Sequence, residues 1–287
     1  MRYEAPDTLD RAVELLSGES GLTRVLAGGT DVLVQLRAGH VEPDLVVDIK
    51  RIDGMFAITE DAEGFRVGAA VSGAMLAEHP GVSRAWPGVV EALELVGSTQ
   101  IQSRATMAGN LCNASPAADS VPAMIAAGAV ARIHGPNGQR DIPVEEVGIA
   151  PGKTALAKGE VVGSILLPAR PAHSGDAYQR FIPRTEMDIA VVGCGISVVL
   201  DGDTISAARV SLGAVAPTAL LVEGAAAALI GSTGDEAAMD ALAAACSAAC
   251  NPIDDKRGTV HFRTKVAGVL ARRTAAAAIA RAKGEAA

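Results

Sequence analysis

The residues best suited to bind a charged ligand lie in a glycine turn near the N-terminus, Ala27-Gly28-Gly29-Thr30-Asp31. The turn follows a short apolar segment, Thr23–Ala27, and precedes a segment with helical spacing. Adjacent glycines let backbone N–H groups face a ligand without a Cβ atom in the way, and the start of a helix favours an anion. A phosphate group fits this turn if the Asp31 carboxylate points away and caps the helix. Plain turn formation is the alternative, because the turn is neither GxGxxG nor a Walker loop.

A second small-residue segment, Thr106-Met107-Ala108-Gly109-Asn110, has similar chemistry. Thr106 offers a hydroxyl group, Asn110 offers two N–H donors, and Asp119 further along is a carboxylate suited to ribose hydroxyl groups. The whole polar stretch of residues 97–120 predicts a long functional loop. Together the two segments suggest a dinucleotide held between two subdomains. The alternative is that Asn110 and Asp119 only satisfy backbone groups of the loop.

The remaining reactive side chains form no recognisable catalytic or metal-binding pattern. The five histidines have no metal-ligand spacing, there is no Ser-His-Asp set, and we expect surface or helix-capping roles for the histidines. The four cysteines, Cys112, Cys194, Cys246 and Cys250, form no CxxC pair, so we expect free thiols. Cys246 and Cys250 are predicted to be small core residues, with a metal or redox pair as the alternative.

The composition excludes several classes of protein. A chain of 287 residues that is 49% hydrophobic and 20% charged can bury a core and suggests about two domains. A net charge of −8 argues against nucleic acid or an anionic membrane as the main partner. The charges in Met1-Arg2-Tyr3-Glu4 do not suit a signal peptide, and no apolar run is long enough to span a bilayer. We therefore expect a cytoplasmic protein without membrane insertion.

Elements that position these segments can be predicted from periodicity and turn residues. The stretch from residue 24 to residue 49 reads as strand, glycine turn, helix and strand, and 168–176 is the best linker. The first half is predicted as α/β and the second as α+β, without an internal repeat. Further expected strands are 65–69, 129–134, 161–167, 196–200 and 205–212, and expected helices are 89–96, 121–127, 219–230, 235–250 and 259–283.

The two glycine segments, Ser115-Pro116-Ala117-Ala118-Asp119 and the later segment 184–190 (Arg-Thr-Glu-Met-Asp-Ile-Ala) together resemble the FAD-binding medium subunit of molybdenum hydroxylases. This is the carbon monoxide dehydrogenase and xanthine dehydrogenase class, and the resemblance covers essentially the whole chain. It implies an α+β protein: a FAD-binding domain, residues 1–170, of two α/β subdomains of the PCMH type, about 1–55 and 56–170. A smaller α+β C-terminal domain, residues 175–287, would have an antiparallel sheet and helices.

The resemblance also implies where FAD binds. The first turn would hold the pyrophosphate, the second segment would meet the pyrophosphate and the flavin side, and Ser115 and Asp119 would lie near the adenosine half. Val161 and Val162 would pass the adenine, and Arg180 would approach the flavin. The full set of implied cofactor residues is Val25, Leu26, Ala27, Gly28, Gly29, Thr30, Asp31, Val32, Ile101, Ala105, Thr106, Gly109, Asn110, Ser115, Asp119, Val161, Val162 and Arg180. Ala108 departs from the glycine often found in relatives, and Val96 stands where some have an aromatic ring.

The implied enzyme has three kinds of subunit, arranged as a dimer of heterotrimers. A molybdenum-cofactor large subunit oxidises the substrate, a small subunit with [2Fe–2S] clusters passes electrons on, and this chain holds FAD and delivers electrons to an external acceptor. No catalytic residue of its own is needed, since the flavin supplies the redox chemistry. The alternatives are an independent flavoprotein oxidoreductase with its own organic substrate, or a non-enzymatic partner module whose glycines serve only turns.

Overall fold

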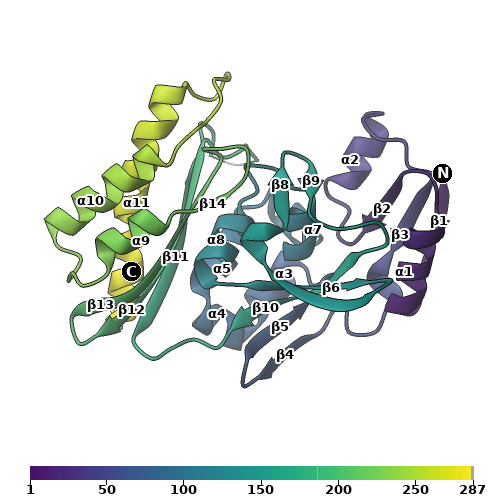
Figure 1. Ribbon diagram of the computed structural model, residues 1–287, viewed down its shortest axis with the longest axis horizontal. Helices are drawn as coiled ribbons and strands as arrows, with labels where there is room; N and C mark the ends of the chain where they lie inside the picture. The colour runs from purple at the N-terminus through teal and green to yellow at the C-terminus, as the bar shows by residue number, and fades with distance from the viewer. Residues whose placement is uncertain (186, 286–287) are drawn as a thin grey trace.

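The computed structural model describes residues 1–185 and 187–285, so Glu186 of the 184–190 motif and the end of the predicted C-terminal domain lie outside the described residues. Three sheets follow one another along the longest axis of the molecule (Figure 1). The N-terminal sheet, the middle sheet and the C-terminal sheet are formed in chain order. Two junctions separate the three sheets, one on each side of the middle unit.

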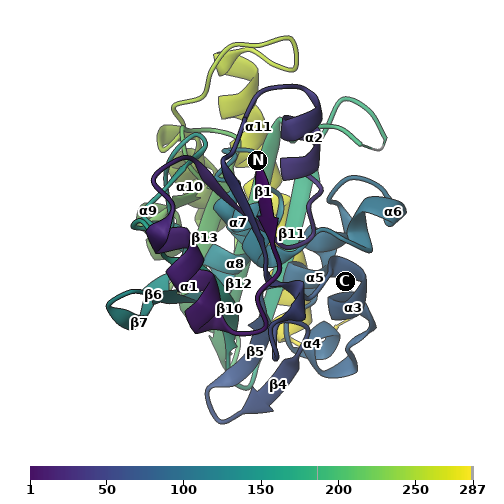
Figure 2. The same ribbon diagram turned by 90° about the vertical axis from the view of Figure 1, so that its right-hand side faces the viewer.

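The N-terminal unit has a parallel sheet of order β1-β3-β2. Its elements are β1 (Arg2–Glu4), α1 (Leu9–Gly18), β2 (Thr23–Leu26), α2 (Val32–Arg37), β3 (Leu45–Asp48) and the 3-10 turn η1 (Ile49–Arg51). Helix α1 begins where the Thr8 side chain accepts a hydrogen bond from the Arg11 N–H, and its apolar face, including Leu15 and Leu16, is buried. The predicted strand–turn–helix–strand order is present as β2, α2 and β3. Figure 2 looks onto this unit from its outer side.

The middle unit is an antiparallel five-stranded sheet of order β4-β5-β10-β6-β7 with short helices packed on it. Its strands are β4 (Ile58–Asp61), β5 (Gly64–Gly68), β6 (Val130–Gly135), β7 (Gly138–Pro143) and β10 (Val161–Pro168), with the small pair β8 (Gly148–Ala150) and β9 (Lys153–Thr154). Its helices are α3 (Gly73–Glu78), α4 (Pro80–Ala85), α5 (Pro87–Glu94), α6 (Thr99–Gln102), α7 (Met107–Cys112), α8 (Ser120–Ala127) and the turn η2 (Val144–Glu146). Helix α8 is buried along its whole length, which explains its uniformly apolar and small side chains.

The C-terminal unit is an antiparallel sheet of order β11-β12-β13-β14 with its own helices on one face (Figure 1), and α5 and α8 of the middle unit also pack against it. Its elements are β11 (Ser174–Phe181), β12 (Val192–Asp201), β13 (Thr204–Gly213), β14 (Leu220–Leu221), α9 (Glu223–Leu229), α10 (Glu236–Ala248) and α11 (Val260–Ala282). Strand β11 begins at Ser174, because Ser174 already pairs with Val199. The linker is therefore shorter than the predicted 168–176.

The alanine-rich face of α11 packs within the chain. Ala271, Ala275 and Ala278 of α11 are fully buried, and a Cβ atom at Gly175 would lie 2.0 Å from the Ala278 carbonyl oxygen. Small residues thus let α11 approach β11 closely. Cys246 is buried and Cys250 half-buried, and both are free thiols, as expected for small core residues.

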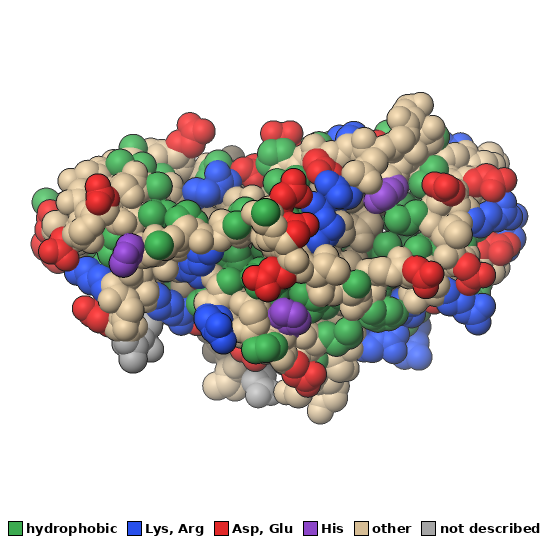
Figure 3. Space-filling view, turned by 90° about the horizontal axis from the view of Figure 1, so that it is seen from below, with side chains coloured by type: hydrophobic (Ala, Val, Ile, Leu, Met, Phe, Trp, Pro, Cys, Tyr) green, Lys and Arg blue, Asp and Glu red, His purple; other side chains and the backbone are tan. Residues whose placement is uncertain are grey.

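On the face seen in Figure 3, acidic and basic side chains alternate along the whole length of the molecule. Such a surface differs from the basic stripe that a polyanion partner requires. Over the described residues, no helix is both long and apolar enough to cross a membrane.

Candidate functional site

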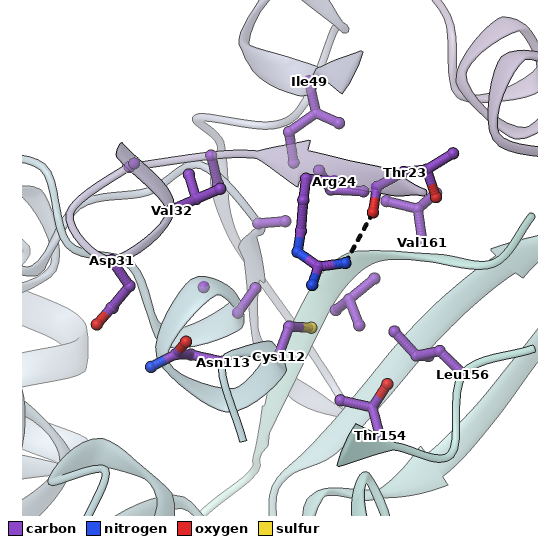
Figure 4. A pocket seen from close by; sticks show the side chains of 18 of the residues that line it. Thr23, Arg24, Asp31, Val32, Ile49, Cys112, Asn113, Thr154, Leu156 and Val161 are labelled. Carbon is purple, nitrogen blue, oxygen red and sulfur yellow. Dashed lines mark hydrogen bonds between the residues drawn. The ribbon is translucent and has the colours of Figure 1, made fainter. Parts of the chain in front are cut away.

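A cavity of about 760 Å³ lies between the N-terminal unit and the middle unit. Its wall combines β2 and the following glycine turn, the start of α2, helix α7, and the segment 152–162 that leads into β10 (Figure 4). Of the predicted cofactor residues, those that line it are Val25, Ala27, Gly28, Gly29, Thr30, Asp31, Val32, Ala105, Thr106, Gly109, Asn110, Val161 and Val162. The two predicted segments therefore face one shared space.

Glycines at two positions shape the first turn for different reasons. Gly29 has φ +81°, a conformation that side chains with a Cβ atom rarely adopt. Gly28 lies against the second segment: a Cβ atom there would be 1.9 Å from the Arg104 carbonyl oxygen. Throughout residues 1–185 and 187–285, the N–H groups of Gly28, Gly29 and Thr30 donate to no protein acceptor. These N–H groups are therefore free to donate to an anion in the cavity.

A partly buried polar cluster of Tyr3, Asp48 and Lys50 supports the residue that precedes the turn. The Lys50 ammonium group donates to the Ala27 carbonyl oxygen (3.2 Å) and to the Asp48 carboxylate (2.7 Å), and Tyr3 donates to the other Asp48 oxygen (2.6 Å). Burial alone would raise the pKa of Asp48, but the hydrogen bonds from Lys50 and Tyr3 outweigh it and lower the pKa. Lys50 lies outside the turn in sequence, yet it fixes the residue from which the turn begins.

The second segment is helical, which corrects the prediction of a continuous loop over 97–120. Helices α6 and α7 form within it, and the Thr106 hydroxyl oxygen accepts from the Gly109 N–H (2.9 Å) and caps α7. Ala108 therefore sits in helical backbone, where its methyl group causes no strain. The Asn110 side-chain oxygen accepts from the N–H (3.2 Å) and hydroxyl (2.7 Å) of Ser120, so its NH₂ group is the part left for a ligand. These helices are too short for hydrophobic periodicity to reveal them.

Asp31 occupies the N-cap position of α2, but its side chain makes no capping hydrogen bond. The carboxylate lines the cavity and points away from β2 (Figure 4). Desolvation by the surrounding cavity wall raises the pKa of Asp31. Phosphate binding at the turn was expected only if the Asp31 carboxylate points away and caps the helix. The carboxylate does point away from the strand, but it does not cap the helix.

The other predicted cofactor residues lie outside the cavity lining; they are Leu26, Ile101, Ser115, Asp119 and Arg180. Leu26 packs beneath the turn, 2.9 Å from the place of a Gly29 Cβ atom. Ile101 belongs to α6, and the Ser115 hydroxyl oxygen accepts from the Ala117 N–H (3.3 Å).

Asp119 and Arg180 meet at the second junction, between the middle and C-terminal units. Arg180 donates to one Asp119 oxygen (2.7 Å) and the Tyr178 hydroxyl group donates to the other (2.8 Å). Burial raises the pKa of Asp119 to about 6, although Arg180 and Tyr178 act in the opposite direction. Arg180 Nε is buried and has no partner among the described residues. These hydrogen bonds to Asp119 connect the start of α8 to β11. The contacts of Asp119 and Arg180 with FAD remain predictions.

Sequence reasoning missed many of the residues that line the cavity, and Arg24 and Leu156 are two of them. Arg24, in β2, directs its guanidinium group into the cavity, and Leu156 adds apolar surface beside Val161 (Figure 4). The available signal was an arginine within an apolar strand directly before the glycine turn. Across the described residues, no cluster of His, Cys, Asp and Glu could hold a metal ion.

Comparison with known protein families assigns the two halves of the chain. Residues 1–170 match the family model described as the FAD binding domain in molybdopterin dehydrogenase. Residues 177–278 match the CO dehydrogenase flavoprotein C-terminal domain. The chain belongs to the family of FAD-binding subunits of molybdenum hydroxylases.

Relatives in this family align over most of their length. The carbon monoxide dehydrogenase medium chain of Hydrogenophaga pseudoflava is 33% identical over 279 residues, 97% of each chain. The putative xanthine dehydrogenase FAD-binding subunit XdhB of Escherichia coli K12 is 34% identical over 218 residues, 75% of this chain and 74% of the relative. The solved H. pseudoflava carbon monoxide dehydrogenase superposes with a TM-score of 0.94 at 33% identity, covering 98% of both chains. Quinoline 2-oxidoreductase of Pseudomonas putida 86 gives 0.89 at 26% identity, covering 99% of this chain and 97% of the other.

Membership of the FAD-binding family confirms several predictions: the family itself, the α+β fold with an antiparallel C-terminal sheet, FAD as cofactor and an oxidoreductase subunit. The residues of the cavity fit such a cofactor. Free N–H groups at the first turn suit a pyrophosphate, and Leu156, Val161 and Val162 offer an apolar wall for a flat ring. A Cβ atom at Gly109 would contact only the Thr106 hydroxyl oxygen (2.9 Å), so this turn of α7 is open toward the cavity.

Proposed function

We propose that this chain carries electrons through FAD within a molybdenum hydroxylase. It would accept them from the [2Fe–2S] clusters of a small partner subunit and pass them to an external acceptor, beside a large subunit that holds the molybdenum cofactor. The assembly would be a cytoplasmic dimer of heterotrimers. The bound flavin supplies the electron-transfer chemistry, and the protein supplies its position and surroundings.

The observation that carries this proposal is the pairing of two small-residue segments across one cavity. Gly28 brings the first turn against Arg104, and the Thr106-capped helix α7 forms the facing wall. The N–H groups of the first turn would hold the pyrophosphate, with the Asn110 NH₂ group and Thr106 next to them. Lys50 and Asp48 would keep the turn in place as the cofactor binds.

The proposed domain division follows the sheets. Residues 1–170, with subdomains of about 1–55 and 56–170, would form the FAD-binding domain, and 175–287 the C-terminal domain. The cavity would then hold the ADP half of FAD between the two subdomains. Asp119 and Arg180 would meet the cofactor at the second junction.

The cavity wall gives an independent flavoprotein oxidoreductase little support. Among the described residues that line the cavity, Cys112 is the one cysteine, and burial raises the pKa of its thiol to about 12, so it is a poor nucleophile at neutral pH. Relatives are named for carbon monoxide, xanthine and quinoline chemistry. Such a range supports substrate selection by another subunit.

The test of non-covalent FAD binding is acid precipitation of the purified, FAD-loaded chain. We expect one FAD per chain and all of the flavin in the supernatant, because Cys112 is protonated and unreactive. Flavin colour in the protein pellet would contradict non-covalent binding, and a colourless purified chain that fails to take up FAD would contradict the proposed function.

A further inference from the structure

Arg24 is an arginine inside the cavity wall without a carboxylate partner. It lies in β2, where it pairs in register with Val46 of β3, and it is half-buried. Its guanidinium group donates to the Thr23 carbonyl oxygen (3.0 Å). Across residues 1–185 and 187–285, no Asp or Glu oxygen lies within 4.0 Å of its nitrogens. Most of its donors are therefore left unused.

The direction of the side chain places those donors in the cavity. In Figure 4 the guanidinium group points into the space between Asp31 and Val32, which follow the glycine turn, on one side and Leu156 and Val161 on the other. Its neighbours in β2, Thr23 and Val25, line the same cavity.

The charges around Arg24 do not neutralise it. Two carboxylates line the cavity: Asp31 points away from β2, and Glu160 is held by Arg140 (2.8 Å). Lys158 and His40 also line the cavity, and neither supplies negative charge at neutral pH. A half-buried cation among apolar side chains favours an anionic ligand, which restores the hydrogen bonds lost from water.

We infer that Arg24 determines specificity for the phosphate-bearing ADP part of the cofactor, by donating to an oxygen of a pyrophosphate that the glycine turn also binds. The inference rests on the proposed FAD site. In this inference the guanidinium group and the free N–H groups of the turn donate to the same pyrophosphate. Planar, forked donors suit phosphate oxygens, so lysine is an incomplete replacement.

The experiment measures ADP and adenosine binding to the FAD-free full-length chain by calorimetry. The variants are Arg24→Gln and Arg24→Lys, and Arg11→Gln is the control, because Arg11 is an exposed arginine on α1 outside the cavity. We expect Arg24→Gln to weaken ADP binding by about tenfold or more, as for the loss of a charge-assisted hydrogen bond. Adenosine binding should not change, and Arg24→Lys should lie between the wild-type chain and Arg24→Gln.

The outcomes separate this inference from the proposed function. Wild-type affinity for ADP in Arg24→Gln, or an equal loss for ADP and adenosine, would overturn the role in phosphate binding while leaving FAD binding intact. A wild-type chain that binds neither FAD nor ADP would overturn the proposed function itself. If Arg24→Gln does not fold, Arg24→Lys still decides: weaker ADP binding with unchanged adenosine binding supports the inference, and unchanged ADP binding contradicts it.

Discussion

Replacing Gly28 by alanine should separate the two segments that form the cavity. The new Cβ atom would lie 1.9 Å from the Arg104 carbonyl oxygen and 2.7 Å from its carbonyl carbon. Real Cβ contacts are longer than 3.0 Å, so either the turn or the backbone at Arg104 must move by more than 1 Å. Neither neighbour is a flexible side chain that could rotate aside. Overpacking of this kind costs about 1–3 kcal/mol of unfolding free energy.

The larger effect of Gly28→Ala should be a loss of FAD affinity. A shift of this size takes the N–H groups of the turn out of hydrogen-bonding range of a pyrophosphate bound between the segments. Losing two charge-assisted hydrogen bonds of about 1.5 kcal/mol each corresponds to a loss of affinity of about 100-fold.

The assay is FAD titration of the FAD-free chain, followed by flavin fluorescence, with thermal unfolding measured in parallel. Gly18→Ala is the matched control, because a Cβ atom at Gly18 would meet nothing within 4 Å. A folded Gly28→Ala chain with wild-type FAD affinity and wild-type unfolding temperature would refute the argument that contact at Gly28 forms the site.

Three further changes test separate parts of the structure. Gly29→Val should weaken FAD binding strongly, because φ +81° excludes a β-branched side chain; unchanged affinity by the same titration would contradict this. Asn110→Ala should lower the unfolding free energy by about 1–3 kcal/mol, because it leaves Ser120 unpaired, and it should also lower FAD affinity. Denaturant unfolding measures the first effect and FAD titration the second. No change in either quantity would count against the role of Asn110. Burial raises the pKa of Asp176 to about 6, above its value in the unfolded chain. Between about pH 4 and 6 the native state therefore binds a proton that the unfolded chain has lost, so the contribution of Asp176 to the free energy of unfolding falls as pH rises through that window. Asp176→Asn should remove this slope in pH-dependent unfolding, and a difference between wild type and variant that grows in favour of wild type with rising pH would contradict the sign.

Local sequence patterns predicted those elements whose shape depends on neighbouring residues. The strand–turn–helix–strand order of residues 24–49 follows from the spacing of apolar residues around Gly28 and Gly29, and it is present as β2, α2 and β3. The strands predicted at 196–200 and 205–212 are likewise present as β12 and β13, which form a hairpin. Such elements contain their own stop signals and need no distant partner.

Features that depend on distant contacts were not predictable from one sequence. Helix α7 is six residues long and is fixed by the Thr106 cap and the Asn110–Ser120 hydrogen bonds, which no periodic pattern announces. Lys50 reaches Ala27 across 23 positions, and Arg180 reaches Asp119 across 61. Arg24 lines the cavity only because β2 lies near residues 152–162, which are more than a hundred positions later in the sequence.

The central claim is that this chain relays electrons and does not oxidise a substrate itself. The most direct test compares anaerobic flavin reduction in the FAD-loaded chain alone with that in the chain co-purified with its iron–sulfur and molybdenum partners, using carbon monoxide, purines, N-heterocycles and aldehydes as donors. We predict that the bleaching of flavin absorbance near 450 nm occurs only in the complex and follows reduction of the [2Fe–2S] clusters. Full-rate reduction of the flavin by an organic donor in the isolated chain would contradict the relay and establish an independent oxidoreductase.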